Sequence, residues 1–200
     1  MQQQKTNRYL YTVPNTILNQ EEIIKGCIKQ NRKAQEALYH QYKKVLFVLS
    51  LKYCSNEAEA EDNLHNAFIE IFTHIKKFEN KGSFEGRMKR IVINKAIGCY
   101  KKNFQLVPIK DDYAQDTTVD SDAMDIPADY ILQLIQELPH QYRLVFSLYE
   151  LDDYSHKEIS EMLSISESTS KSNLHRAKQL LKEKIKKEHS THNYLQQHGK

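Results

Sequence analysis

The chain has 200 residues, of which 40% are hydrophobic and 28% are charged, and its formal net charge at neutral pH is only +3. This composition predicts a globular protein of one or two domains, and no apolar run approaches the roughly 20 residues that cross a bilayer. The cysteines Cys27, Cys54 and Cys99 are odd in number and lack metal-binding spacing. We therefore expect reduced thiols in a cytoplasmic protein that is neither secreted nor membrane-spanning.

The first half of the chain predicts a helical domain over 20–104, because apolar residues recur there at three- and four-residue spacing. Asn56 followed by Glu59 is typical of a capping box ahead of the clearest apolar stripe, "LHNAFIEIFTHI". In chain order, the pattern predicts a flexible polar tail at 1–19, helices at 20–28, 34–53, 64–75 and 84–102, and a glycine-containing loop at 78–86.

The second half predicts a smaller helical domain over 127–187, after an acidic linker at 105–126 and before a polar C-terminal tail at 188–200. Pro127 suits the first turn of a helix. A further helix follows Pro139, and its expected buried residues are Tyr142, Val145, Phe146 and Tyr149. Because helix formers dominate and no regular alternation indicates strands, the expected fold class is all-α, with two small helical domains joined by the linker.

Charge is distributed unevenly along the chain. Residues 76–102 contain nine Lys or Arg and two Glu, and residues 171–187 contain seven Lys or Arg and one Glu. Between them, residues 110–129 hold seven Asp and one Lys. We therefore expect two separate cationic lobes tethered by an anionic connector, with solvated helix faces as the simpler alternative.

The stretch "SHKEISEMLSISESTSKSNLHRAKQLLKEKI", at 155–185, predicts a helix-turn-helix. Ser155 and Glu158 form a capping box for its first helix, and Ser166 can cap the second after a short turn. Projected at about 100° per residue, the polar and cationic side chains of the second helix share one arc, and its apolar side chains share another. Since the N-terminal half of such a helix enters the major groove, the polar arc predicts DNA binding, and an ordinary exposed face is the alternative.

The segment "ELPHQYRLVFSLYELDDYSHKEISEMLSISESTSKSNLHRAKQLLK" resembles region 4 of bacterial sigma-70 family factors, in their extracytoplasmic-function (ECF) group. "EAEAEDNLHNAFIEIFTHIKKF" and "GSFEGRMKRIVINKAIGCYKKN" resemble region 2 of the same group. The resemblance covers roughly 20–187 and implies a factor that joins core RNA polymerase, recognises the −10 and −35 promoter elements and helps open the duplex. The acidic linker is then either a solvated spacer or a segment that imitates RNA charge in a polymerase channel.

The resemblance also implies the residues that carry each task. Those expected to read the −35 element are Ser168, Thr169, Lys171, Ser172, His175, Arg176 and Lys178. Those expected at the −10 element and in melting, around a base-capturing loop at 78–84, are Asn80, Lys81, Ser83, Phe84, Arg87, Arg90, Asn94, Lys95, Tyr100, Lys101 and Lys102. Those expected to bind core polymerase, on a clamp-binding helix at 61–72, are Glu61, Asp62, His65, Asn66, Phe68 and Ile69.

Some positions depart from the family pattern. His65 and Asn66 stand where Gln-Asp is expected, Arg87 holds a tryptophan-like position, and Gly98 holds an aspartate-like one. The turn of region 4, often Glu-Gly-Thr, has Ser168 in its centre. The differences at His65 and Asn66 concern the contact with core polymerase, and the difference at Arg87 concerns melting of the DNA duplex.

Other chemistry finds no support in the sequence. The nine histidines form no H-E-x-x-H pattern and pair with no cysteine at zinc spacing, and there is no phosphate loop or nucleophile elbow. We therefore expect a protein that is not an enzyme and binds no metal or cofactor. The expected partners are core RNA polymerase, through its clamp and flap regions, promoter DNA and an anti-sigma factor, with no small-molecule substrate.

Two alternative functions remain open from the residues alone. One is a free-standing helix-turn-helix regulator that binds a palindromic site as a dimer without joining polymerase. The other is a diverged, sigma-like helical interaction protein, which the unusual His65, Asn66 and Arg87 favour.

Overall fold

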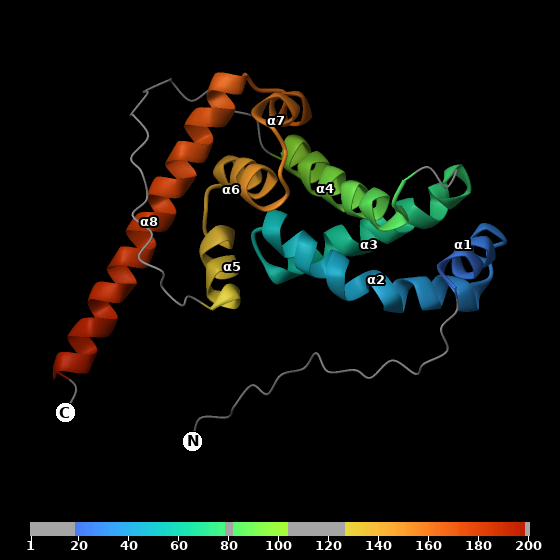
Figure 1. Ribbon diagram of the computed structural model, residues 1–200, viewed down its shortest axis with the longest axis horizontal. Coiled ribbons are helices and arrows are strands. Elements are labelled where there is room, and N and C mark those ends of the chain that lie inside the picture. Colours follow the sequence, from blue (N-terminus) through green and yellow to red (C-terminus); the bar gives the residue numbers. More distant parts are fainter. Residues whose placement is uncertain (1–18, 79–81, 104–126, 199–200) are drawn as a thin grey trace.

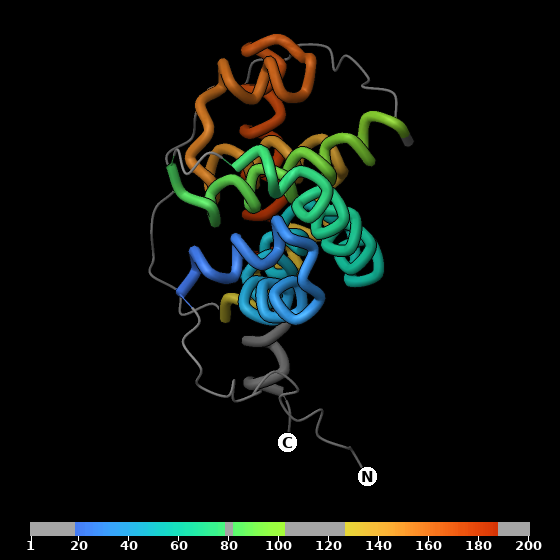
Figure 2. Tube along the Cα trace, turned by 90° about the vertical axis from the view of Figure 1, so that its right-hand side faces the viewer, coloured from blue at the N-terminus to red at the C-terminus, as the bar shows by residue number. Residues whose placement is uncertain are grey.

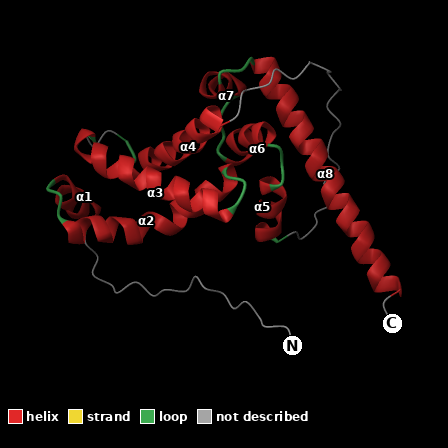
Figure 3. Ribbon diagram, turned by 180° about the vertical axis from the view of Figure 1, so that it is seen from behind, coloured by secondary structure: helices red, strands yellow, loops and turns green. Residues whose placement is uncertain are grey.

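The computed structural model describes residues 19–78, 82–103 and 127–198, and every regular element in these ranges is a helix (Figure 3). The all-α prediction is therefore confirmed for the described residues. The first half consists of α1 (Gln20–Ile28), α2 (Arg32–Tyr53), α3 (Glu57–His74), the short 3-10 helix η1 (Ile75–Lys77) and α4 (Phe84–Asn103). The acidic linker at 105–126, the tail at 1–18, and Asn80 and Lys81 of the predicted −10 set lie outside the described residues.

Asparagine side chains begin each of the first three helices. Asn19 accepts a hydrogen bond from the Glu21 amide, and Asn31 accepts one from Ala34. At α3, Asn56 Oδ1 accepts from the Glu59 amide at 2.9 Å, as the sequence predicted. The Glu59 carboxylate accepts from the amide of Ser55 at 2.7 Å, one residue earlier than in a standard capping box.

The apolar stripes of α1–α4 meet in one core, in which Leu38, Leu46, Ala67, Met88 and Val92 are almost completely buried. The observed inner face of α4 includes the predicted Met88, Val92 and Ile97, while Lys101 and Lys102 lie outside. These helices form the elongated body in Figure 1, with α1 at the end remote from α8.

The second half contains α5 (Ala128–Gln136), α6 (His140–Phe146), a π-helical turn η2 (Ser147–Leu151), α7 (His156–Leu163) and α8 (Glu167–His198). Pro127 lies immediately before α5 rather than inside its first turn. The backbone of α8 continues as a helix through most of the range predicted as a polar tail.

The predicted buried face of the helix after Pro139 is partly wrong. Val145 is buried, but Tyr149 is 37% exposed, and Leu144 and Leu148 occupy the core instead. The π turn at Ser147–Leu151 adds a residue to the helical repeat and so rotates the following side chains. In addition, the first half covers the face that carries Arg143 and Ser147.

The two halves are in contact, because one apolar cluster crosses from the first half into the second. Leu144, Leu148, Ile159 and Leu163 belong to the same cluster of buried residues as the core of α1–α4. Figures 1 and 2 show α6 and α7 lying against the ends of α2 and α4. The two helical regions that the sequence predicted therefore pack against each other, and the predicted domain boundaries stay a prediction. A second, smaller cluster joins α5 to α8 through Leu134, Leu138, Ala177 and Leu181.

Polar contacts also join the halves around the end of α2. The Tyr53 hydroxyl donates to Asp152 Oδ2 at 2.6 Å, and Lys52 Nζ lies 3.3 Å from the other oxygen of that carboxylate. The guanidinium of Arg143, only 2% exposed, donates to Ser55 Oγ at 2.8 Å and to the carbonyl of Leu138 at 2.7 Å. Such bonds satisfy polar groups that the contact removes from water.

Candidate nucleic-acid interface

The helix-turn-helix consists of α7, a three-residue turn and α8. Ser155 and Glu158 form the predicted capping box, with the Ser155 amide donating to the Glu158 carboxylate at 2.9 Å. Ser164 ends α7 in the left-handed conformation, with φ of 58°, and the Thr169 amide donates to Ser166 Oγ at 3.0 Å at the start of α8. The caps therefore lie at the positions that the sequence predicted.

The predicted recognition face of α8 points outward. Lys171 and Lys178 are exposed, and the remaining members of the −35 set are half-buried. Leu174, Ala177 and Leu181 on the opposite arc are buried, as predicted. The exposed Lys171 and Lys178 and the half-buried hydroxyl groups thus lie on the N-terminal half of α8, which is the part of such a helix that contacts base edges.

Two cationic side chains of this face, Lys178 and Arg176, contact other residues of the second half. Lys178 Nζ lies 2.9 Å from Glu150 Oε1, and Arg176 Nη1 donates to the Tyr142 hydroxyl at 3.4 Å. Both contacts come from α6 and η2, so the elements behind the helix-turn-helix orient these side chains. Lys171 is exposed and forms no such contact with another described residue.

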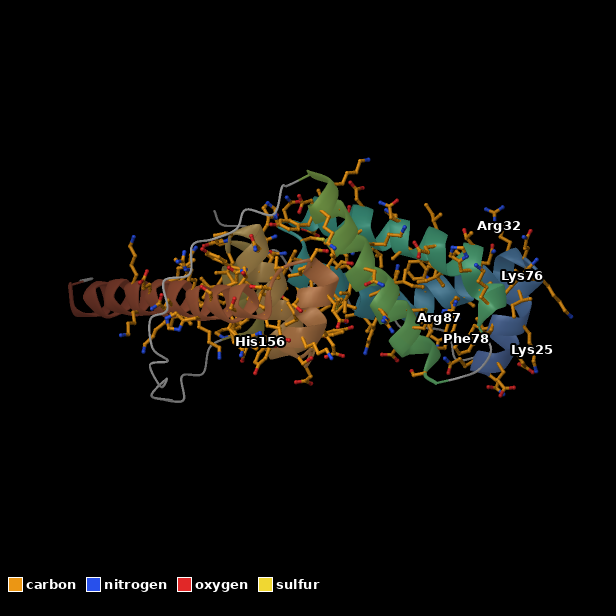
Figure 4. All side chains as sticks on the ribbon, turned by 90° about the horizontal axis from the view of Figure 1, so that it is seen from above. Lys25, Arg32, Lys76, Phe78, Arg87 and His156 are labelled. Carbon is orange, nitrogen blue, oxygen red and sulfur yellow. The ribbon has the colours of Figure 1, made fainter. Side chains whose placement is uncertain are left out.

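His156 joins the two helices of the motif. Its ring, labelled in Figure 4, stacks on Tyr149 with centroids 4.4 Å apart. Its Nδ1 lies 2.9 Å from Ser170 Oγ. Burial, together with the nearby Lys171, lowers the pKa of His156 below its ordinary value. The neutral imidazole is therefore the form that fits this packing.

Two aromatic residues, Phe78 and Phe84, flank the predicted base-capturing loop, and Arg87 of α4 lies beside Phe78. Phe84 is buried against Phe78, with ring centroids 4.8 Å apart, so it supports the loop from inside and does not present a surface for a base. Arg87 Nη1 donates to the Lys77 carbonyl at 2.9 Å, and its guanidinium lies 5.8 Å from the Phe78 ring centroid. Ser83 is exposed and its hydroxyl accepts from the Gly86 amide at 3.1 Å, which caps α4.

The predicted −10 residues farther along α4 divide into exposed and engaged side chains. Arg90, Asn94 and Lys102 are exposed, whereas Lys95 forms an ion pair with Glu70. Tyr100 is only 8% exposed and its ring lies beside His140 of the second half, with centroids 6.0 Å apart.

Lys101, the neighbour of Tyr100, also contacts the second half, where it donates to Ser164 Oγ at 3.0 Å. In this arrangement the contact between the halves thus uses two residues that were predicted to touch DNA, Tyr100 and Lys101.

The predicted polymerase-binding set lies on the outer face of α3, with one exception. Glu61, Asp62, His65 and Asn66 are exposed, and Ile69 is an apolar side chain that is 64% exposed. The exception, Phe68, is only 3% exposed because it packs between Tyr39 and Phe72, so its expected direct contact with a partner is not supported by its position.

A cavity of about 670 Å³ opens where α3, α4 and α6 meet. Asp62 and Asn66 of the predicted polymerase set line it together with Asn94 and Lys95 of the predicted −10 set. Cys54 also lines it, and burial raises the pKa of this thiol to about 12, so it stays protonated at neutral pH. The structure therefore brings together residue sets that the sequence assigned to different partners.

Sequence reasoning missed the residues that join the halves, Tyr53, Arg143 and Asp152. Their sequence signal was weak, since each looks like an ordinary surface or core residue of an amphipathic helix. Arg143 of α6 and Ser147 at the start of η2 lie four residues apart, which could have indicated a polar strip at an interface.

Sites of other kinds are not evident in the described parts of the chain. No group of three or more His, Cys, Asp or Glu side chains there is placed to hold a metal ion. Within the same ranges, every helix is too short or too polar to cross a bilayer.

A capped helix-turn-helix with an outward cationic face, packed on a second helical body, defines a DNA-binding protein of the transcription machinery. Comparison with known families agrees: residues 128–181 match sigma-70 region 4, and residues 38–103 match sigma-70 region 2. The chain belongs to the sigma-70 family, in its ECF group, and is a promoter-directing sigma factor.

Known relatives match along most of their length. The chain is 29% identical to the ECF RNA polymerase sigma factor SigW of Bacillus subtilis, over 83% of this chain and 98% of that protein. It is 28% identical to the ECF RNA polymerase sigma factor SigM of the same organism, over 74% of this chain and 92% of that protein. A solved structure of the sigma factor RpoE in complex with the anti-sigma factor NepR from Bartonella quintana is similar at 16% identity, with a TM-score of 0.47, over 76% of this chain and 96% of that one.

Proposed function

We propose that the chain binds core RNA polymerase, recognises −35 DNA with the N-terminal half of α8 and −10 DNA with the loop and outer face of α4, and thereby starts transcription at specific promoters. The observation that carries this proposal is the outward face of α8 around Lys171, on a helix capped and oriented as in DNA-reading helix-turn-helix proteins.

The proposed polymerase contact is the exposed face of α3 around Asp62, Asn66 and Ile69. Ile69, 64% exposed, gives this polar face an apolar side chain that a partner would remove from water. The chain then acts as a specificity subunit with no catalytic group of its own, in the cytoplasm, and an anti-sigma factor is a further expected partner.

Reconstitution with core polymerase tests the proposal. The purified chain and core enzyme are incubated with fragmented genomic DNA, and the 5′ ends of the transcripts are sequenced. Transcripts with a common pair of upstream elements support it. Operator binding by a dimer without capture of core polymerase identifies a free-standing regulator instead, and a chain that binds neither DNA nor polymerase is a helical interaction protein.

A further inference from the structure

Two cysteines line the cavity where α3, α4 and α6 meet. Cys54 ends α2 and is only 7% exposed, whereas Cys99 lies near the end of α4 and is exposed. Both contribute to the wall of this cavity, whose volume is about 670 Å³. The third cysteine, Cys27 of α1, is buried in the core and does not line it. Two thiols of different exposure therefore face one space that opens to solvent.

The packing of α2 on α4 brings these two cysteines to one place. The two helices touch near the start of α4, where the rings of Tyr42 and Phe84 have centroids 6.4 Å apart. Cys54 and Cys99 lie toward the C-terminal ends of the same two helices. Burial, the Glu59 carboxylate and, to a smaller extent, the charge of Cys99 raise the pKa of Cys54. The Cys99 sulfur is therefore close enough to act on the Cys54 sulfur.

The backbone at both cysteines can adjust to bring the sulfur atoms together. Cys54 is the C-cap of α2, with φ of −94° and ψ of 156°, so its side chain is not held within a helical turn. Gly98 precedes Cys99 and also lines the cavity, with nothing within 4 Å of the Cβ that it lacks. A glycine inside a helix weakens the helix locally. Since a disulfide requires Cα atoms about 4.4–6.8 Å apart, such adjustable backbone on both sides helps to meet this requirement.

The two thiols suit different steps of an oxidation by hydrogen peroxide. The exposed Cys99 is the thiol that peroxide in solution reaches first. Its thiolate attacks one peroxide oxygen, the O–O bond breaks, and hydroxide leaves and takes up a proton to form water, so that Cys99 becomes a sulfenic acid. The Cys54 sulfur then attacks the sulfenic sulfur, the S–O bond breaks, and the thiol proton leaves with the hydroxyl group as a second water. Two thiols are thereby oxidised to one disulfide, and the peroxide accepts the two electrons.

A nearby cation supports the second of these steps. Burial is the largest influence on the pKa of Cys54 and raises it, while the guanidinium of Arg143 lowers it. Arg143 is held beside Cys54 by its hydrogen bond to Oγ of the next residue, Ser55, at 2.8 Å. Cys54 therefore does not react with peroxide by itself, but a positive charge stabilises the thiolate that attacks oxidised Cys99.

We propose that Cys54 and Cys99 form a peroxide-sensitive pair that closes to a disulfide, and that this bond regulates the −10 surface at the end of α4. Lys101 and Lys102, both predicted to contact −10 DNA, are exposed and lie within one helical turn of Cys99. A bond from Cys99 to α2 fixes this turn and removes the adjustment that DNA binding needs. The regulatory part of the inference rests on the proposed function, whereas formation of the disulfide does not.

The first test maps the oxidised thiols. The full-length chain is treated with a modest molar excess of hydrogen peroxide, alkylated, digested without reductant and analysed by mass spectrometry. We expect a peptide that joins Cys54 to Cys99, an intact monomer lighter by two hydrogen atoms, and an unoxidised Cys27. Dithiothreitol should restore both thiols.

Three variants assign the roles of the cysteines. Cys54→Ala should stop at the sulfenic acid of Cys99, which dimedone traps, and Cys99→Ser should leave Cys54 as a thiol. Cys27→Ala, the matched control, should form the disulfide as the unsubstituted chain does. The inference is overturned by a Cys99 sulfinic acid beside an unreacted Cys54 in the unsubstituted chain, by covalent dimers joined through Cys99, or by equal oxidation of Cys54 in Cys99→Ser.

The second test measures the effect of the disulfide on transcription. The chain is oxidised, freed of peroxide and then added to core polymerase with promoter DNA. We expect promoter-specific transcription to fall severalfold, to recover with dithiothreitol, and to be unaffected by the same treatment in Cys99→Ser. Equal transcription by the oxidised and reduced chains contradicts the regulatory role. Because peptide mapping contains no polymerase or DNA, failure of the proposed function and failure of the disulfide to form are separate results.

Discussion

The hydroxyl of Tyr53 at the end of α2 donates to Asp152 Oδ2 at 2.6 Å, across the contact between the two halves. Ninety-nine residues of chain separate the two partners. The bond is shielded, since the Tyr53 side chain is almost completely buried, and the nearby carboxylate and burial raise the pKa of the phenol well above its ordinary value. The Tyr53 hydroxyl therefore stays protonated at neutral pH and donates to Asp152.

Removing the acceptor should loosen the contact between the halves. In Asp152→Ala the buried Tyr53 hydroxyl and the partly buried Lys52 lose their partner, and we expect the free energy of unfolding to fall by about 1–3 kcal/mol. Urea denaturation measures the change. The matched control is Asp153→Asn, because Asp153 is exposed and asparagine tolerates its φ of 57°. Equal stability of the two variants would show that the halves separate freely.

Acidification should destabilise the protein through two histidines. Burial, with Arg143 nearby, lowers the pKa of His140, and burial with Lys171 lowers that of His156. Once the pH falls below the ordinary histidine pKa of 6.5, the unfolded chain binds more protons than the folded one. The free energy of unfolding therefore decreases as the pH falls from that value toward the lower pKa of the folded protein.

The measurement is urea denaturation at about pH 7.5 and about pH 5.5, a range in which histidines titrate. His140→Gln and His156→Gln should each show a smaller loss between the two conditions than the unsubstituted chain. A protein that becomes more stable on acidification in this range contradicts the assignment.

Two glycines should respond to alanine in opposite directions. Gly26→Ala forces a Cβ to within 2.5 Å of that of Ala34 and pushes α1 away from α2, so we expect a loss of about 1–3 kcal/mol. Gly98 lies within α4 with nothing near its missing Cβ, so Gly98→Ala should stabilise the protein by about 0.5–1 kcal/mol. Thermal unfolding of both variants tests the pair, and a stable Gly26→Ala protein would be inconsistent with the close α1–α2 packing.

Lys171 should matter for promoter selection. Lys171→Ala removes an exposed cation from the start of α8 without disturbing a buried contact, and we expect promoter-specific transcription to fall about tenfold, the scale of one base contact. The control is Lys44→Ala, an exposed lysine on α2. Run-off transcription with core polymerase and circular dichroism distinguish lost recognition from lost folding. Normal initiation by Lys171→Ala would show that another face of α8 meets the DNA.

Local signals in the sequence predicted the helix caps and the buried face of α8 correctly. The capping residues Asn56, Ser155 and Ser166 lie where their side chains were expected to start helices. The inner face of α8 around Leu174 and Ala177 also agrees with the helical projection. These features depend on neighbours within one or two turns, and such interactions can be read from spacing alone.

Predictions that depended on exposure were less successful. Phe68, Phe84 and Tyr100 were expected to contact partners, but all three are buried. An aromatic residue at helical spacing fits a core and a binding surface equally well, so sequence cannot separate the two readings without knowledge of what packs against the helix. Tyr149 shows the reverse error, because it lies within the π turn Ser147–Leu151, where side chains depart from the α-helical repeat.

The sequence by itself determined the helical class, the two capped motifs and the outward cationic face of α8, because these follow from periodicity and from hydrogen bonds between close neighbours. Only the tertiary structure decided that the two halves share one core, that Asp152 receives Tyr53, and that Cys54 and Cys99 line the same cavity. Such contacts join residues far apart in the chain, and their positions are set by how whole helices pack, which no local pattern specifies.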